Sequence, residues 1–149
     1  SKAFNMTGWR LGWACGSADV LEALARVKSF YDTGVFLPVQ AAGAAALRAG
    51  DDYLAENRAR LQRRRDAAVE AFRDAGFRVR TPDAALYLWL PVPQGTSDVD
   101  FAGRALEEEA VLLMPGSDLG PGGEGYVRAA LAEPPERCAE AADRIARLL

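Results

Sequence analysis

Four side chains that can bind or react with small charged molecules stand near the two ends of the sequence. Ser1, Lys2 and Arg10 lie within the first ten residues, and Arg128 lies between apolar neighbours near the C-terminus. A neutral lysine amine can form an imine with an aldehyde and can later move a proton between carbon atoms. An arginine among apolar residues is costly to bury unless an anion such as a carboxylate faces it. Each of these residue types is also common among exposed side chains. The surrounding sequence must therefore distinguish a chemical role from simple exposure.

Two longer motifs contain these residues. Residues 1–13 read Ser-Lys-Ala-Phe-Asn-Met-Thr-Gly-Trp-Arg-Leu-Gly-Trp. This segment closely resembles the Schiff-base signature of the class I/II aminotransferases, which are fold type I enzymes of pyridoxal phosphate. Residues 126–131, Tyr-Val-Arg-Ala-Ala-Leu, resemble the strand that carries the substrate-binding arginine of the same family, and a Met-Pro-Gly-Ser-x-x-Gly-Pro-Gly-Gly loop precedes them. The order and separation of the motifs also agree, so the resemblance covers essentially the whole chain.

The resemblance implies a role for each candidate residue. Lys2 would be the catalytic residue and would hold pyridoxal 5'-phosphate covalently. Ser1 and Arg10 would bind the cofactor phosphate, for which a hydroxyl and a bidentate guanidinium are suitable donors. Arg128 would bind the substrate α-carboxylate. No metal ion is expected, because the sequence has no histidine and its two cysteines lie far apart.

The resemblance also implies an activity. The protein would transfer an amino group between an amino acid and a 2-oxo acid, and residues 27–29 and 32–36 are similar to diaminopimelate-type members. Methionine, aspartate, aromatic and alanine transaminases remain open. So do the carbon-sulfur lyases, aminocyclopropane-carboxylate synthases and acyl-transferring synthases among related fold type I enzymes. The alternative outside the enzymes is a non-catalytic interaction module that kept the fold.

We expect the chain to be the C-terminal part of such an enzyme. It has no initiator methionine and begins one residue before the lysine. In the family, the aspartate that pairs with the pyridine nitrogen, the ring-stacking aromatic residue and the glycine-rich phosphate segment all precede this lysine. We therefore expect residues 1–149 alone to be inactive and the full-length protein to be a homodimer.

Composition limits the choice of partners. Of the 149 residues, 50% are apolar, and 18 basic against 21 acidic residues give a net charge of -3, which offers no general attraction to nucleic acid or to anionic membranes. No apolar run approaches the ~20 residues that span a bilayer. We expect a soluble cytoplasmic protein with small-molecule substrates, in which Cys15 and Cys138 are reduced thiols of the core.

The expected elements alternate between helix and strand. Helices are expected over residues 17–30, 38–49, 51–75, 97–109 and 135–149, and strands over residues 9–16, 77–80, 86–90, 111–114 and 126–131. This order indicates an α/β fold. With the resemblance, it predicts the end of a large cofactor-binding domain at 1–50, a long connecting helix at 51–75 and a small α+β domain at 76–149.

Three other features are interpreted as structural. The helix expected over residues 51–75 carries the acidic residues Glu56, Asp66, Glu70 and Asp74 and arginines at positions 58, 60, 63, 64 and 65, which predicts a solvated, ion-paired helix face. The glycine-rich segment 116–125 lacks a Gly-Lys-Ser/Thr ending and opens no helix, so it is a connection that shapes a cleft. Core or pocket-wall positions are expected for Trp9, Trp13, Tyr87 and Trp89.

Overall fold

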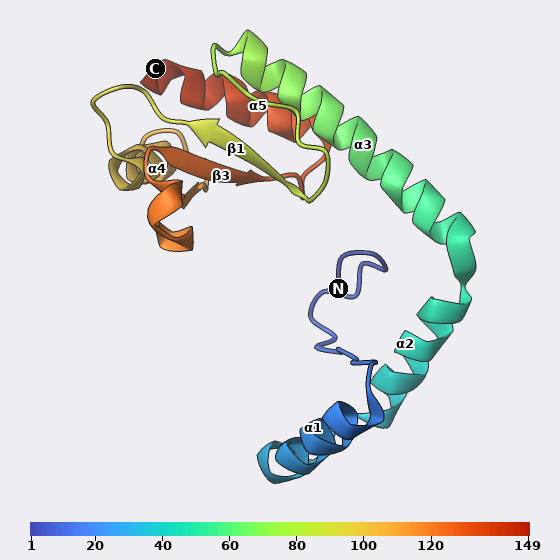
Figure 1. Cartoon of the computed structure of the whole chain (residues 1–149). Helices are drawn as coiled ribbons and strands as arrows, with labels where there is room; N and C mark the ends of the chain where they lie inside the picture. The colour runs from blue at the N-terminus through green and yellow to red at the C-terminus, as the bar shows by residue number, and fades with distance from the viewer. The chain divides into compact units, whose positions relative to one another are not determined.

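Residues 1–149 are described by the computed structural model and form two compact units, Ser1–Arg58 and Ala59–Leu149. Both contain helices, and the second contains a three-stranded sheet, which confirms the expected mixed α/β composition (Figure 1). The helices are α1 (Ala18–Tyr31), α2 (Leu37–Arg48), α3 (Gly50–Asp74), α4 (Asp98–Glu107) and α5 (Pro135–Ile145). The strands are β1 (Tyr87–Pro91), β2 (Met114–Pro115) and β3 (Tyr126–Ala130). None of these helices combines the length and the apolar composition of a membrane-spanning segment.

The helices of the first unit begin and end close to the expected residues. Helix α1 follows Ser17, and α2 carries Pro38 in its first turn, where a missing N–H costs no hydrogen bond. Gly50 has a φ of 81°, a left-handed conformation that suits glycine, and it divides α2 from α3. Leu11 packs against α2 at Gly43, the buried residue of that helix.

The strand expected at residues 9–16 is absent. The segment makes no ladder hydrogen bonds, because a strand needs a paired neighbour and the first unit contains no other strand. The core or pocket-wall positions expected for Trp9 and Trp13 and the core position expected for Cys15 are not found in this chain. Trp9 and Trp13 are 49% and 73% exposed, and Cys15 is exposed instead of buried.

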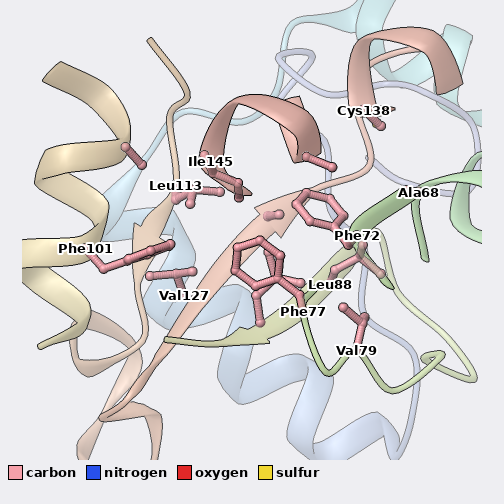
Figure 2. Packing of buried hydrophobic residues seen from close by; sticks show 14 of the residues in the cluster. Ala68, Phe72, Phe77, Val79, Leu88, Phe101, Leu113, Val127, Cys138 and Ile145 are labelled. Atoms are coloured by element: carbon pink, nitrogen blue, oxygen red, sulfur yellow. The ribbon is translucent and has the colours of Figure 1, made fainter. Parts of the chain in front are cut away.

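The second unit is built around one antiparallel sheet with the strand order β1-β3-β2. Side chains alternate between its two faces, so Leu88 and Leu90 of β1 and Val127 and Ala129 of β3 are buried on the same side. Buried residues of α3, α4 and α5 complete this hydrophobic cluster (Figure 2). The opposite face carries aromatic and charged side chains.

Phe77 joins three parts of the core (Figure 2). Its ring meets Phe72 of α3 edge-on at 5.8 Å between centroids and Phe101 of α4 at 6.3 Å. Full burial of side chains of this size contributes about 1.5–3 kcal/mol each. Cys138 is buried in α5, as expected, and this burial raises the pKa of its thiol, so it is a packing residue.

Local capping signals set the helix ends as the sequence predicts. The Ser97 hydroxyl accepts a hydrogen bond from the Asp100 backbone N–H at 3.0 Å and donates one to the Asp100 carboxylate at 2.7 Å. The first of these bonds caps the start of α4, and the second joins the two side chains, so only half of a capping box is formed. At the end of α3, Gly76 has a φ of 97°, and the Phe77 N–H bonds the Phe72 carbonyl at 2.9 Å.

Two expected strands differ from the structure. Residues 77–80 pair with no strand, and the Arg73 guanidinium instead binds the Val79 carbonyl at 2.8 and 3.0 Å. Of residues 111–114, only Met114 joins β2. Leu149, the last residue of the helix expected over 135–149, is 54% exposed. After α5 the chain continues as a 3-10 turn, which has fewer residues per turn than an α-helix. This change directs the side chain of Leu148 toward the core.

The arginines of α3 form the expected solvated face only in part. Arg65 pairs with Asp66 at 2.6 Å. Arg64 and Arg65 also donate hydrogen bonds to the backbone carbonyls of Ala132 and Pro82. These two side chains therefore attach the helix to neighbouring loops of the second unit.

Candidate active site

Ser1, Lys2 and Arg10 all lie in the irregular segment that precedes α1. The three side chains are exposed, and no ion pair or hydrogen bond engages the hydroxyl, the amine or the guanidinium. Ser1 contributes only its backbone carbonyl, which accepts a hydrogen bond from Thr7 at 3.2 Å. An amine, a hydroxyl and a guanidinium are thus accessible and without a protein partner.

Helix α3 holds the backbone that follows Lys2. Asn57 donates a hydrogen bond to the Ala3 carbonyl at 3.1 Å and accepts one from the Asn5 amide at 3.3 Å. The same Asn5 amide donates to the Tyr53 hydroxyl at 2.9 Å. The ring of Phe4 stacks on Tyr53 with 6.0 Å between centroids and an angle of 11°. Residues 3, 4 and 5 are therefore each fixed to the first half of α3.

The backbone between Lys2 and Arg10 is tightly folded. Asn5, Gly8 and Arg10 have φ values of 51°, 93° and 54°. For a residue with a side chain this left-handed conformation costs of order 1 kcal/mol, and such strain is concentrated at binding and catalytic sites. Asn5 and Arg10 therefore lie in a strained stretch of backbone.

The residues present fit the cofactor that the resemblance implies. Pyridoxal 5'-phosphate offers an aldehyde and a dianionic phosphate, and the segment offers an unengaged amine, a hydroxyl and a guanidinium. A competing carboxylate would neutralise Arg10 or Lys2, but neither residue forms an ion pair. Lys2 would hold the aldehyde carbon, and Ser1 and Arg10 would hold the phosphate.

Arg128 occupies the middle of β3 on the sheet face opposite the core. Trp89 of β1 and Met114 of β2 are its cross-strand partners, and its side chain is half-buried. The guanidinium carbon lies 4.2 Å from the centroid of the Tyr87 ring, a cation–π contact. No carboxylate pairs with Arg128 and no hydrogen bond uses its donors. A half-buried cation with free donors can accept an anion as a partner.

Aromatic residues extend this exposed face of the sheet. Trp89 stacks on Tyr126 with 5.5 Å between centroids and an angle of 15°. Tyr87, Trp89 and Tyr126 also line an open cleft of about 680 Å³, together with Arg78 and Arg80. The expectation that Tyr87 and Trp89 form a pocket wall is thus confirmed.

A buried carboxylate holds the glycine-rich loop that leads to β3. Asp98, at the start of α4, accepts a hydrogen bond from the Ser117 N–H at 2.8 Å. Hydrogen bonds from the Ser117 hydroxyl and backbone keep the pKa of the Asp98 carboxyl below its ordinary value. Within the loop, a Cβ on Gly123 would lie 1.9 Å from the Gly116 carbonyl oxygen, so only glycine fits.

The structure divides the proposed site residues between the two units. Ser1, Lys2 and Arg10 belong to the first, and Arg128 belongs to the second. Sequence reasoning missed Asn57 and Asp98, the two buried polar residues. The signal for Asp98 was its place just after a helix-capping serine, whereas nothing in the local pattern distinguishes Asn57 from other polar residues of α3.

The family of the chain follows from comparison with known proteins. The family model described as aminotransferase class I and II matches residues 1–145, so the chain belongs to that family, whose members depend on pyridoxal phosphate. The LL-diaminopimelate aminotransferase of Moorella thermoacetica is 51% identical over 149 residues, which are 100% of this chain and 38% of the relative. That of Oleidesulfovibrio alaskensis is 45% identical over 148 residues, 99% of this chain and 38% of the relative.

Solved structures agree with the expected fold. The probable N-succinyldiaminopimelate aminotransferase of Thermus thermophilus has a TM-score of 0.90 and 36% identity, covering 99% of this chain and 40% of that one. The aromatic aminotransferase of Pyrococcus horikoshii has a TM-score of 0.89 and 31% identity, covering 100% and 41%. The chain therefore corresponds to part of a fold type I aminotransferase and spans about two-fifths of the length of these relatives.

Proposed function

We propose that the protein containing this chain is a pyridoxal-phosphate-dependent amino-acid aminotransferase of the diaminopimelate type. The observation that carries this proposal is the pair of unengaged cationic groups. Lys2 has a free amine in a segment fixed to α3, and Arg128 has a free guanidinium on an aromatic sheet face. The identity to LL-diaminopimelate aminotransferases supports the substrate type.

Each residue has a defined task in this proposal. When bound, pyridoxal phosphate supplies an electron-withdrawing ring that stabilises negative charge at the substrate α-carbon. Lys2 holds the cofactor covalently, and its amine, once released by the substrate, moves the α-proton. Ser1 and Arg10 retain the phosphate, and Arg128 orients the substrate by its α-carboxylate.

The proposal includes the setting in which the protein acts. The substrates are an amino acid and a 2-oxo acid, and the full-length protein acts in the cytoplasm as a homodimer. Residues 1–50, 51–75 and 76–149 would serve as the end of a cofactor-binding domain, a connecting helix and a small domain. The family resemblance supports these assignments.

A comparison of the two lysines of the chain tests the activity. The full-length protein should convert LL-diaminopimelate and a 2-oxo acid by amino transfer, and Lys2→Ala should remove turnover without changing the far-UV circular dichroism. Lys28→Ala is the matched control, because Lys28 is half-exposed and pairs with Asp32, and it should keep full turnover.

Two results would contradict the proposed function. Near-normal amino transfer by Lys2→Ala would exclude Lys2 as the covalent anchor. Release of ammonia and a thiol from a sulfur amino acid, with no amino transfer to any 2-oxo acid, would identify a carbon-sulfur lyase in place of an aminotransferase.

A further inference from the structure

Asn57 is a buried amide in a helix whose neighbouring residues are exposed. The residue is only 4% exposed, whereas Glu56 and Arg58 beside it are exposed. Burial of an amide is unfavourable unless its donors and acceptor find partners. Those partners therefore indicate what the residue does.

Two partners of Asn57 lie within three residues of Lys2. Asn57 donates to the carbonyl of Ala3, the next residue after Lys2, and accepts from the side chain of Asn5. Tyr53, one helical turn earlier, accepts a second hydrogen bond from Asn5 and stacks on Phe4. Two successive turns of a continuous helix thus fix the three residues that follow the lysine.

We propose that Asn57, supported by Tyr53, is a positioning residue for the Lys2 amine. This inference rests on the proposed function. A lysine side chain is long and flexible, so its amine can be aimed only if the backbone at its base is fixed. The bond from Asn57 to Ala3 fixes the peptide carbonyl one residue beyond Lys2 and thereby sets the direction in which the side chain leaves the backbone.

A purely stabilising role would have a different signature. Loss of a stabilising hydrogen bond lowers the temperature of unfolding but leaves the folded molecules with normal chemistry. Loss of a positioning bond changes the environment of the amine in every folded molecule. It therefore changes the pH midpoint of the visible absorbance of the bound cofactor and lowers kcat, while KM for the amino acid stays near its original value.

The experiment uses the full-length protein loaded with pyridoxal phosphate and three variants. Asn57→Ala removes the hydrogen bonds to Ala3 and Asn5, and Tyr53→Phe removes only the hydroxyl while keeping the ring that stacks on Phe4. Glu56→Ala is the matched control, since Glu56 is the exposed neighbour of Asn57. The readouts are kcat, KM, the absorbance midpoint and the fraction of Lys2 labelled after borohydride reduction.

We expect Asn57→Ala to lower kcat about 10-fold or more, because a misplacement of about 1 Å can cost about 100-fold. Its absorbance midpoint should shift, its labelling of Lys2 should fall and its KM should stay within about twofold. Tyr53→Phe should shift the midpoint in the same direction by a smaller amount and serves as the test if Asn57→Ala does not fold. Glu56→Ala should match the original protein.

Two outcomes separate this inference from the proposed function. If the original protein labels Lys2 but both variants keep its midpoint and kcat, the positioning role is wrong and the function stands. If the original protein places no cofactor on Lys2, the proposed function and the positioning role both fail.

Discussion

At the scale of single residues, the proposed site is defined by cations without partners. Several charged side chains of the second unit pair with a neighbour, as Arg104 does with Glu108 and Arg147 with Glu109. Arg128 has no such partner and rests instead on the ring of Tyr87. An aromatic face holds a guanidinium in place without using its N–H donors, which leaves them free for a carboxylate.

Replacement of Arg128 by leucine tests this arrangement. A hydrogen bond to a charged group contributes about 1.5–3 kcal/mol, so we expect Arg128→Leu to lower kcat/KM for amino acids about 10- to 150-fold. For amines that lack a carboxylate, kcat/KM should change little. Arg80→Leu removes a charge from an exposed residue of the neighbouring cleft and should have little effect on either substrate. Equal losses for amino acids and simple amines would disprove the carboxylate contact.

At the scale of elements, the helices could be predicted from sequence because their signals are local. Ser97, Pro38 and Gly76 mark helix ends by capping and backbone geometry that involve only a few neighbouring residues. Strands depend on distant partners. Residues 9–16 and 77–80 have suitable composition but no neighbouring strand with which to pair, and β-propensity cannot reveal that.

In the candidate site, too, features with local signals could be predicted and features that depend on distant contacts could not. Lys2, Ser1, Arg10 and Arg128 were recognised from local motifs, and their assignment stays a prediction. The contacts that hold them could not be predicted, because the contact between Asn57 and Ala3 spans 54 positions and that between Arg128 and Tyr87 joins two strands. Burial of Asn57 is a property of the folded unit and has no sequence pattern.

The link between α4 and the glycine-rich loop predicts a pH-dependent stability. The pKa of Asp98 is lower in the folded protein than its unfolded value of about 3.9, so the ionised form stabilises the fold above that pH. This stabilisation is lost as the pH falls through the folded pKa. Asp98→Asn should therefore lower the urea midpoint at pH 7, and the difference from the original protein should shrink below about pH 4.

Asp118→Asn is the control for this prediction, since Asp118 is an exposed carboxylate of the same loop. It should leave the urea midpoint unchanged at both pH values. A difference for Asp98→Asn that stays constant from pH 7 to pH 3 would mean that packing, and not the carboxylate charge, accounts for the effect.

At the scale of the whole molecule, the proposed catalytic groups are distributed over two compact units, and α3 is the element that contributes residues to both. The chain spans 38% of the length of the two LL-diaminopimelate aminotransferases compared with it. Within this chain, the proposal makes Lys2 the single covalent anchor. Its two lysines, Lys2 and Lys28, provide an internal comparison.

The most direct test is to locate the covalent cofactor. The full-length protein is loaded with pyridoxal phosphate, reduced with borohydride, digested, and its peptides are mapped by mass spectrometry. We predict a stable cofactor adduct on Lys2 and none on Lys28, because Lys28 pairs with Asp32 whereas the Lys2 amine is free. An adduct on Lys28 or elsewhere, with Lys2 unmodified, would contradict the assignment of Lys2 as the catalytic lysine.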